Sequence, residues 1–319
     1  MKFAVTVFTL LLAAVSALVF VQYQGYTNDK SSVEGDYYYS QEIEVEHRGD
    51  SLDIRHHFKN LPEHEIIIDW PENAVDAQCF LDTEKACKRF NESFTKIEAG
   101  ENNSQSISYV IPLKNGLQSG KLLKDVFVQL KSGSVKFSTV HITTSPKVAG
   151  SWVTGLPLIG YQQLSLVNYA MFTGEGSVQD LYWQKSNFSY LSTKDAYSLY
   201  SNTGITQAEQ KKLQSLKAIS DDHIAIVKVK NVPKIQGYRI LFVNDTNVKA
   251  IQRSLTMQQL EQMYNFEETP NWLKQLVGSI VVGEKIGYST SQQVLDEIRA
   301  ELDEEQFVNF KERIVALEG

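Results

Sequence analysis

The sequence predicts a chain in three parts: an N-terminal transmembrane helix, an all-β sandwich-like domain, and an α+β domain with a helical C-terminus. A long uncharged apolar run near the N-terminus indicates the first part. Many short alternating runs separated by turn residues indicate the second, and apolar stripes at helical spacing indicate the third. We place a signal anchor at residues 1–23, a stalk at 24–36, the β-sandwich-like domain at 37–147 and the α+β domain at 148–319.

The N-terminal run, residues 3–21, contains no charged side chain. As a helix it would span roughly 30 Å, the thickness of the hydrocarbon core of a bilayer. Only Lys2 and the terminal amine precede it, so we expect a cytoplasmic N-terminus and the bulk of the chain outside the cell membrane. A signal peptide cleaved after Val15-Ser16-Ala17 is the alternative, and it also predicts export.

The two cysteines, Cys79 and Cys87, lie in the exported part, where disulfides persist. Their spacing is not Cys-x-x-Cys, and no second cysteine pair or nearby His completes a zinc site. We therefore predict a disulfide that closes a short loop and stabilises the fold by about 2–3 kcal/mol. Two free thiols are the alternative, because disulfide geometry is demanding.

The β-sandwich-like domain begins with the clearest pattern of the chain, residues 40–58. Apolar and charged residues alternate on both sides of Gly49-Asp50, which predicts an antiparallel hairpin with one buried face and its turn at that dipeptide. His47 and His56 are expected on the same face of this hairpin. Because two imidazoles without a third ligand make a weak site, we predict no metal there.

The α+β domain is expected to open with a connecting or packing segment at residues 150–176, followed by three strands. Several of its helix starts are marked by a capping residue or by Pro at the first helical position. We expect the strands at 179–192, 223–230 and 237–245, and helix starts at Thr206, Thr256, Pro270, Ser291 and Asp303.

Composition argues against two classes of partner. The net charge is −7 with a pI near 5.5, and the chain has no basic cluster. We therefore expect neither nucleic-acid binding nor strong binding to anionic lipid.

The chain contains no Gly-x-Ser-x-Gly, His-Glu-x-x-His or P-loop motif. The most reactive stretch is Asp221-Asp222-His223, which could bind a metal or act in acid–base catalysis. A solvated turn between a helix and a strand is the simpler interpretation of the same residues. We assign no catalytic, cofactor-binding or metal-ligating residue, expect no cofactor, and keep these three as candidate functional residues.

Four Asn-x-Ser/Thr sequons occur, at Asn91, Asn102, Asn187 and Asn244. In an exported eukaryotic chain these asparagines are candidates for N-glycosylation, and in a bacterium they carry no such meaning.

Together these features favour a binding or adaptor protein over an enzyme: single-pass, membrane-anchored and extracytoplasmic, with another envelope protein or a cell-wall polymer as partner. Such a protein should expose an apolar or aromatic patch. An envelope hydrolase with a non-standard site in the C-terminal domain is one alternative, and it requires Asp221, Asp222 and His223 to meet in a pocket. A membrane-tethered chaperone or assembly factor is the other, and it requires a groove without catalytic groups.

Overall fold

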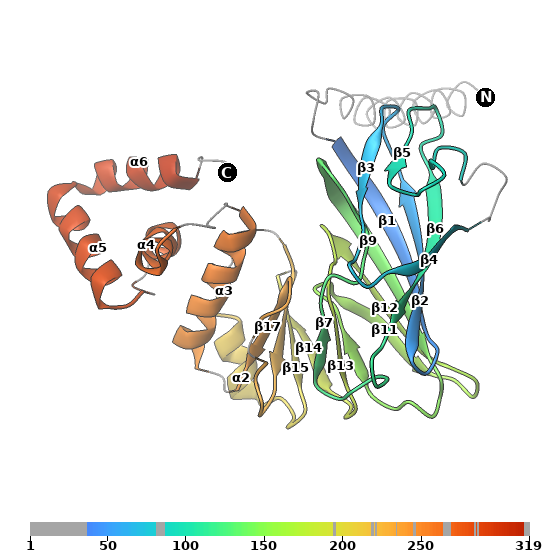
Figure 1. Cartoon of the computed structure of the whole chain (residues 1–319). Coiled ribbons are helices and arrows are strands. Elements are labelled where there is room, and N and C mark those ends of the chain that lie inside the picture. The colour runs from blue at the N-terminus through green and yellow to red at the C-terminus, as the bar shows by residue number, and fades with distance from the viewer. Residues whose placement is uncertain are drawn as a thin grey trace, which may run out of the picture.

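The computed structural model shows mostly β-sheet, with helices gathered near the C-terminus (Figure 1). The predicted transmembrane helix and stalk lie outside the residues that the structure describes. Within the described residues, no helix is long and apolar enough to cross a membrane. The structure describes residues 37–80, 87–193, 196–217, 220, 222–233, 235–244, 247–263, 269–283, 285 and 287–315.

A seven-stranded sheet dominates the larger half of the molecule. Its strands β1 and β2 form the predicted antiparallel hairpin, and Gly49 in the turn has a φ of 70°, which glycine adopts readily. The apolar members of the alternation, such as Ile43 and Ile54, are buried, so both the strands and their buried face are confirmed. The sheet order is β11 (Leu158–Gln163), β12 (Asn168–Glu175), β9 (Gly133–Thr144), β1 (Tyr37–His47), β2 (Ser51–Lys59), β6 (Gln105–Pro112) and β4 (Val75–Cys79).

Two three-stranded sheets pack against the buried face of the large sheet. Ile66, Leu130 and Leu181 from these small sheets share one continuous apolar core with the inward residues of the large sheet. The small sheets are β5 (Lys96–Ile97), β3 (Ile66–Asp69) and β8 (Gln129–Leu130), and β10 (Ser151–Val153), β13 (Leu181–Gln184) and β7 (Lys121–Leu123).

The segment at residues 150–176 forms strands rather than the connecting segment that we expected. β12 pairs antiparallel with β9, and β11 extends the sheet beyond β12, so the large sheet continues across residues 147 and 148, where we had placed a domain boundary. In β12, Asn168, Ala170 and Phe172 are buried, whereas Tyr169 and Met171 between them are only partly covered. This alternation is the signal of a half-buried strand.

The C-terminal half is built on a four-stranded sheet. Helices α2 and α3 cover one face of it through Leu213, Ile251 and Leu255. Its other face packs on the β10–β13–β7 sheet through a cluster that includes Tyr182 and Phe242. The sheet comprises β14 (Ser189–Thr193), β15 (Tyr197–Ser201), β16 (Ile224–Lys228) and β17 (Ile240–Val243), and the helices are α2 (Gln207–Leu213), α3 (Val248–Met263), α4 (Asn271–Val282), α5 (Ser289–Glu301) and α6 (Glu304–Val315).

Four of the five helix starts were predicted at or near their observed positions, and one was predicted wrongly. Thr206 caps α2 in a capping box with Glu209, and Asp303 accepts a hydrogen bond from the Gln306 N–H at the start of α6, as predicted. The predicted start at Thr256 is wrong, because this residue is fully buried in the middle of α3. Asn247 caps α3 instead, accepting from the Lys249 N–H at 3.1 Å. The remaining two starts fall within two residues of their predicted positions.

Candidate functional site

The two cysteines form the predicted disulfide. Cys79 ends β4, and its Cα atom lies 5.7 Å from that of Cys87. That separation lies in the range that a disulfide spans without backbone movement. The bond ties β4, the last strand at one edge of the large sheet, to the segment that leads to β5.

The structure separates the candidate residues Asp222 and His223, and Asp221 lies outside the described residues. His223 is buried at the start of β16, where its Nδ1 lies 2.8 Å from the Gly155 carbonyl oxygen and its Nε2 lies 2.9 Å from Ser198 Oγ. A carbonyl oxygen only accepts, so Nδ1 carries the proton and Nε2 accepts from the serine. Burial lowers the pKa of His223 to about 4. This imidazole is a neutral, fully satisfied part of the interior.

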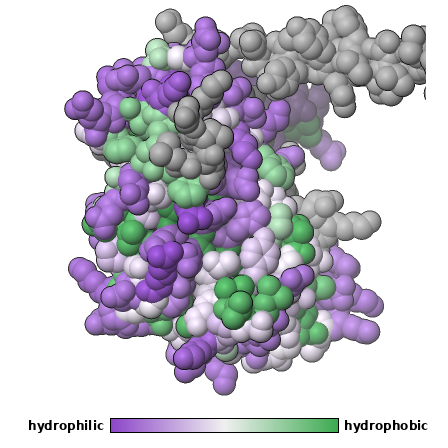
Figure 2. All heavy atoms as spheres, turned by 90° about the vertical axis from the view of Figure 1, so that its right-hand side faces the viewer, coloured by the Kyte–Doolittle hydropathy of each residue, from purple (hydrophilic) through white to green (hydrophobic). Residues whose placement is uncertain are grey.

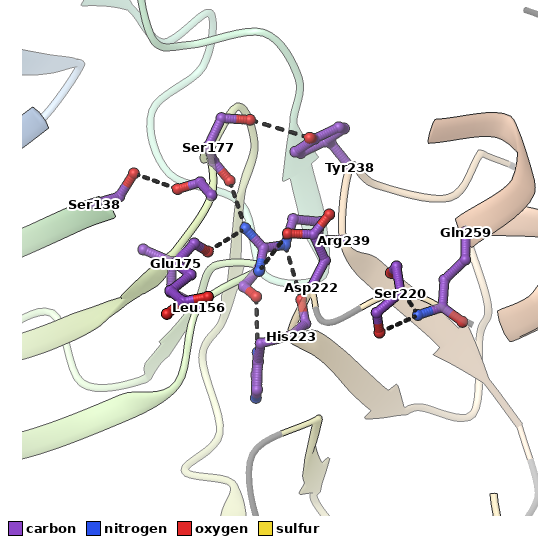
Figure 3. Close-up of polar contacts among 12 residues, drawn as sticks. Ser138, Leu156, Glu175, Ser177, Ser220, Asp222, His223, Tyr238, Arg239 and Gln259 are labelled. Atoms are coloured by element: carbon purple, nitrogen blue, oxygen red, sulfur yellow. Dashed lines mark hydrogen bonds and ion pairs between the residues drawn. The ribbon is translucent and has the colours of Figure 1, made fainter. Parts of the chain in front are cut away.

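Asp222 points away from His223 and toward Arg239, whose Nη2 is 3.6 Å from Asp222 Oδ1 (Figure 3). Arg239 has no exposed surface, and its Nε donates to the His223 carbonyl oxygen at 2.8 Å. Its Nη1 donates to the carbonyl oxygens of Glu175 and Ser177, each at 2.9 Å. Desolvation lowers the pKa of this guanidinium. Arg239 thus joins the end of β12 to the four-stranded sheet, which is a structural role.

A hollow of about 540 Å³ opens beside this arginine, between the β-sheet half and the C-terminal half. Asp222 and Tyr238 line it, and the Ser177 hydroxyl donates to the Tyr238 oxygen at 3.0 Å. Burial raises the pKa of Tyr238. Asp69 and Lys131 also line this hollow, but it does not contain His223. The acid–base arrangement that a hydrolase would need is not formed by these residues.

A larger hollow, of about 640 Å³, lies on the outer face of the seven-stranded sheet. It is built from the outward members of the alternation that buries Ile43 and Ile54 on the other face. These outward residues come from adjacent strands, so the sheet itself holds them at fixed spacing. Its charged and aromatic lining includes Glu42, Glu44, Glu46, Arg48, Asp53, Arg55, Asp76, His141 and Tyr169.

Ion pairs organise the middle of this larger hollow. Arg55 Nη1 is 3.3 Å from Glu44 Oε2, and the Arg55 guanidinium lies 4.5 Å from the centre of the Phe80 ring. Arg48 lies between two carboxylates, 2.8 Å from Glu46 and 3.1 Å from Asp53. The hydrogen bond from Arg48 holds the pKa of Glu46 below its ordinary value. Five carboxylates line the hollow against two guanidinium groups, so the lining is acidic.

A chain of polar side chains crosses four strands, β12, β9, β1 and β2, at the other end of the same hollow. The Tyr169 hydroxyl lies 2.6 Å from His141 Nδ1, and His141 Nε2 lies 3.4 Å from Glu42 Oε1. The second oxygen of Glu42 accepts from Lys59 Nζ at 2.7 Å. That hydrogen bond is the main cause of the lowered pKa of Glu42. These side chains present donors and acceptors to solvent from a rigid surface.

His47 and His56 lie on the same face of the hairpin, as predicted, and both are buried. His56 Nε2 lies 2.9 Å from Gln41 Oε1, and the Gln41 amide donates to Ser138 Oγ at 2.9 Å. Burial lowers the pKa of His56 to about 3, so it is neutral. Across the described residues, no group of three or more His, Cys, Asp or Glu side chains is arranged to hold a metal ion.

Exposed apolar side chains concentrate on one hairpin. Ile159 and Tyr161 of β11 are 60% and 40% exposed, and Leu164 and Leu166 in its turn are 51% and 82% exposed. Figure 2 views the molecule from the right-hand side of Figure 1 and shows hydrophobic residues gathered low on that face among paler and hydrophilic ones. Four exposed apolar side chains therefore lie close together in sequence on one hairpin at the end of the large sheet.

Sequence reasoning missed both the larger hollow and the buried arginine. The alternation of Glu42, Glu44 and Glu46 correctly indicated an outward face, but alternation does not reveal whether that face is concave. Nothing in the local sequence of Arg239 distinguishes it from a surface arginine. Its role arises from carbonyl groups about 60 residues away in the chain.

Comparisons with known proteins do not identify the chain. No protein-family model matches it, and no curated protein matches it. Among solved structures it is similar to an M1 zinc metallopeptidase from Deinococcus radiodurans, at a TM-score of 0.47 and 11% identity over 83% of this chain and 74% of that one. A mutant of that enzyme bound to a Tyr-ser-ala substrate gives a TM-score of 0.46 at 12% identity, over the same shares of the two chains. Likeness at this level decides neither the fold nor the activity of this chain.

Proposed function

We propose that this protein is a single-pass, membrane-anchored extracytoplasmic protein of the cell envelope that works by binding a partner. The observation that carries the proposal is the hollow of about 640 Å³ on the outer face of the seven-stranded sheet. Most of its charged groups project from paired strands, and Arg48 in the β1–β2 turn is held by ion pairs with Glu46 and Asp53, so they are positioned before any partner arrives. Such preorganisation lowers the ordering cost of binding.

The charge of the hollow supports one kind of partner. Its carboxylates outnumber its guanidinium groups, and Arg48 is already shared between Glu46 and Asp53. A partner with basic groups would pair with the excess carboxylates of the hollow, whereas an anionic polymer would be repelled by them. Of the two partners that the sequence suggested, we therefore favour an envelope protein with a basic surface over a cell-wall polymer.

The location in the envelope is supported by two features. The uncharged run at residues 3–21 is long enough to span a bilayer as a helix. The disulfide between Cys79 and Cys87 fits an oxidising compartment outside the cytoplasm. Both features agree with a chain whose β-sheet half faces away from the cytoplasm.

The alternatives gain less support from the geometry. The hydrolase hypothesis needs Asp222 and His223 in one pocket, but His223 is buried and turned away from the hollow that Asp222 lines. The chaperone hypothesis needs a groove for apolar segments, but the lining of the larger hollow is rich in charge.

The proposal is tested by crosslinking in intact cells of the native host, followed by purification of the tagged full-length protein from solubilised membranes. The control is residues 1–30 fused to an unrelated domain. We expect a protein with a basic surface to be enriched over that control, and the enrichment to fall when the wash is raised to high salt. Repeated failure to enrich any protein would contradict the proposal.

A further inference from the structure

Strand β11 forms one end of the seven-stranded sheet. It pairs with β12 on one side, and no strand among the described residues pairs with it on the other. Its first residue is partly covered, because Tyr190 donates a hydrogen bond to the Leu158 carbonyl oxygen at 3.2 Å. From Ile159 onward β11 is a free sheet edge within the part of the chain that the structure describes, with backbone groups that another strand could pair with.

This edge lacks the protection that exposed strands usually carry. Natural edge strands are commonly defended by charged side chains, especially lysine, or by an inward-pointing charge. Here residues 148–174 contain no Asp, Glu, Lys, Arg or His, although 22% of the chain is charged. A register shift between Leu158 and Gly160 disturbs only the beginning of the strand.

The same edge concentrates exposed apolar surface. Thirteen large hydrophobic residues are exposed in the part of the chain that the structure describes. Four of them fall in eight consecutive positions of this hairpin, residues 159–166: Ile159, Tyr161, Leu164 and Leu166. The other nine are scattered over the described chain. An uncharged edge with this much apolar surface is a site for strand pairing.

A second copy of the chain is the occupant that fits this edge best. A charged partner finds no complementary charge on it, and a membrane surface is not favoured because no basic side chain stands in the hairpin to attract anionic lipid. An identical β11 supplies an equally uncharged, equally apolar edge. It also lets two acidic chains meet where neither carries charge.

We propose that two copies of this protein pair antiparallel through β11 and form a symmetric dimer with one continuous sheet. Antiparallel pairing within a sheet places the two-fold axis perpendicular to it, so the outer faces of both copies lie on the same side. The two hollows of about 640 Å³ would then face the same way, as a bivalent surface. The dimer is an inference of its own, since it would hold even if the hollows bound nothing.

The first test is the mass of the full-length protein in detergent, measured by light scattering after size-exclusion chromatography. We expect a dimer for the natural sequence and half of that protein mass for the double variant Tyr161→Lys, Leu166→Lys. The matched control is Ile67→Lys, which places a lysine at a 52%-exposed apolar residue of β3 and should remain dimeric. A monomeric natural protein at every concentration, or a dimer that survives the double variant, would overturn the proposal. The second outcome would assign dimerisation to another part of the chain.

Crosslinking in intact membranes provides a second, independent readout. Both native cysteines are in the disulfide, so a single Gln162→Cys substitution places one free thiol on the edge strand. A short bis-maleimide should link two such chains, because the symmetry axis brings the two edge strands together. The same reagent should leave Val308→Cys, on α6, unlinked. Equal linking of both variants, or of neither, would contradict pairing through β11.

Discussion

The guanidinium of Arg239 donates a hydrogen bond to the main-chain carbonyl oxygen of Glu175 at 2.9 Å, across 64 residues of sequence. This contact joins the end of β12, in the large sheet, to the start of β17, in the four-stranded sheet. The same side chain also satisfies the carbonyls of Ser177 and His223. One buried arginine therefore fixes the C-terminal half against the β-sheet half.

Replacement of Arg239 by Met should lower the free energy of unfolding by about 3–5 kcal/mol. The change leaves three carbonyl groups without their donor, one at a buried contact and two at partly buried contacts, which is more costly than the loss of the hydrogen bonds alone. Urea-induced unfolding of the solubilised full-length protein would measure it. Asp222→Asn is the control: it removes only a 3.6 Å contact to a carboxylate that is 37% exposed, so it should cost under about 1 kcal/mol. Equal losses in both variants would contradict the role of the buried carbonyls.

Gly155 is required because Arg239 packs directly against it. A Cβ atom added at Gly155 would collide with the Arg239 Cβ, and the backbone on both sides is buried, so neither can move freely. We expect Gly155→Ala to lower the melting temperature substantially, as overpacking typically costs about 1–3 kcal/mol. Gly160→Ala is the matched control, since no atom lies within 4 Å of a Cβ added there. A thermal shift of the same size in both variants would refute this account.

Two buried histidines should make the fold sensitive to acid. The pKa values of His56 and His223 are lowered to about 3 and about 4 in the folded state, below the ordinary value of 6.5. Between pH 6.5 and those values the unfolded chain binds protons that the folded chain does not. Stability is thus complete above pH 6.5 and falls as the pH is lowered, by up to about 1.4 kcal/mol per pH unit for each histidine.

The His56→Gln variant isolates the contribution of His56 to this pH dependence. We expect the slope of unfolding free energy against pH, measured between pH 4.5 and 6.5, to fall by up to about 1.4 kcal/mol per unit relative to the natural protein. Val308→Ala, at an exposed position and without a titratable group, should leave the slope unchanged. Parallel pH profiles for the natural protein and His56→Gln would show that His56 is not neutral in the fold.

The sequence was most informative where one local rule decided the structure. The alternation around Gly49 predicted the hairpin and its buried face, and the spacing of Cys79 and Cys87 predicted the disulfide. It failed at residues 150–176, where Gly and Pro interrupt the alternation and conceal three strands. It also failed at Thr256, where a capping pattern lies inside a helix because both residues of that pattern are buried. Local motifs do not encode burial from distant segments.

The candidate site was less predictable than the fold. Asp222 and His223 are adjacent in the sequence and were therefore treated as one reactive stretch. In the structure, the transition from loop to strand sends their side chains into different surroundings. The larger hollow gathers residues from β1, β2, β4, β6, β9 and β12, so its composition depends on strand order and register. Neither strand order nor concavity can be derived from an alternating pattern.

The most direct test of the account is whether the larger hollow captures the partner. The informative pair of variants is Glu44→Lys, in the hollow, and Asp296→Lys, in α5. Both remove a carboxylate from an exposed ion pair, with Arg55 at 3.3 Å and with Lys285 at 2.6 Å, so their effects on stability should be similarly small. The measurement is crosslinked capture of the partner by each full-length variant in intact cells. We predict at least a tenfold loss for Glu44→Lys and none for Asp296→Lys, and equal capture by the two variants would contradict binding in the hollow.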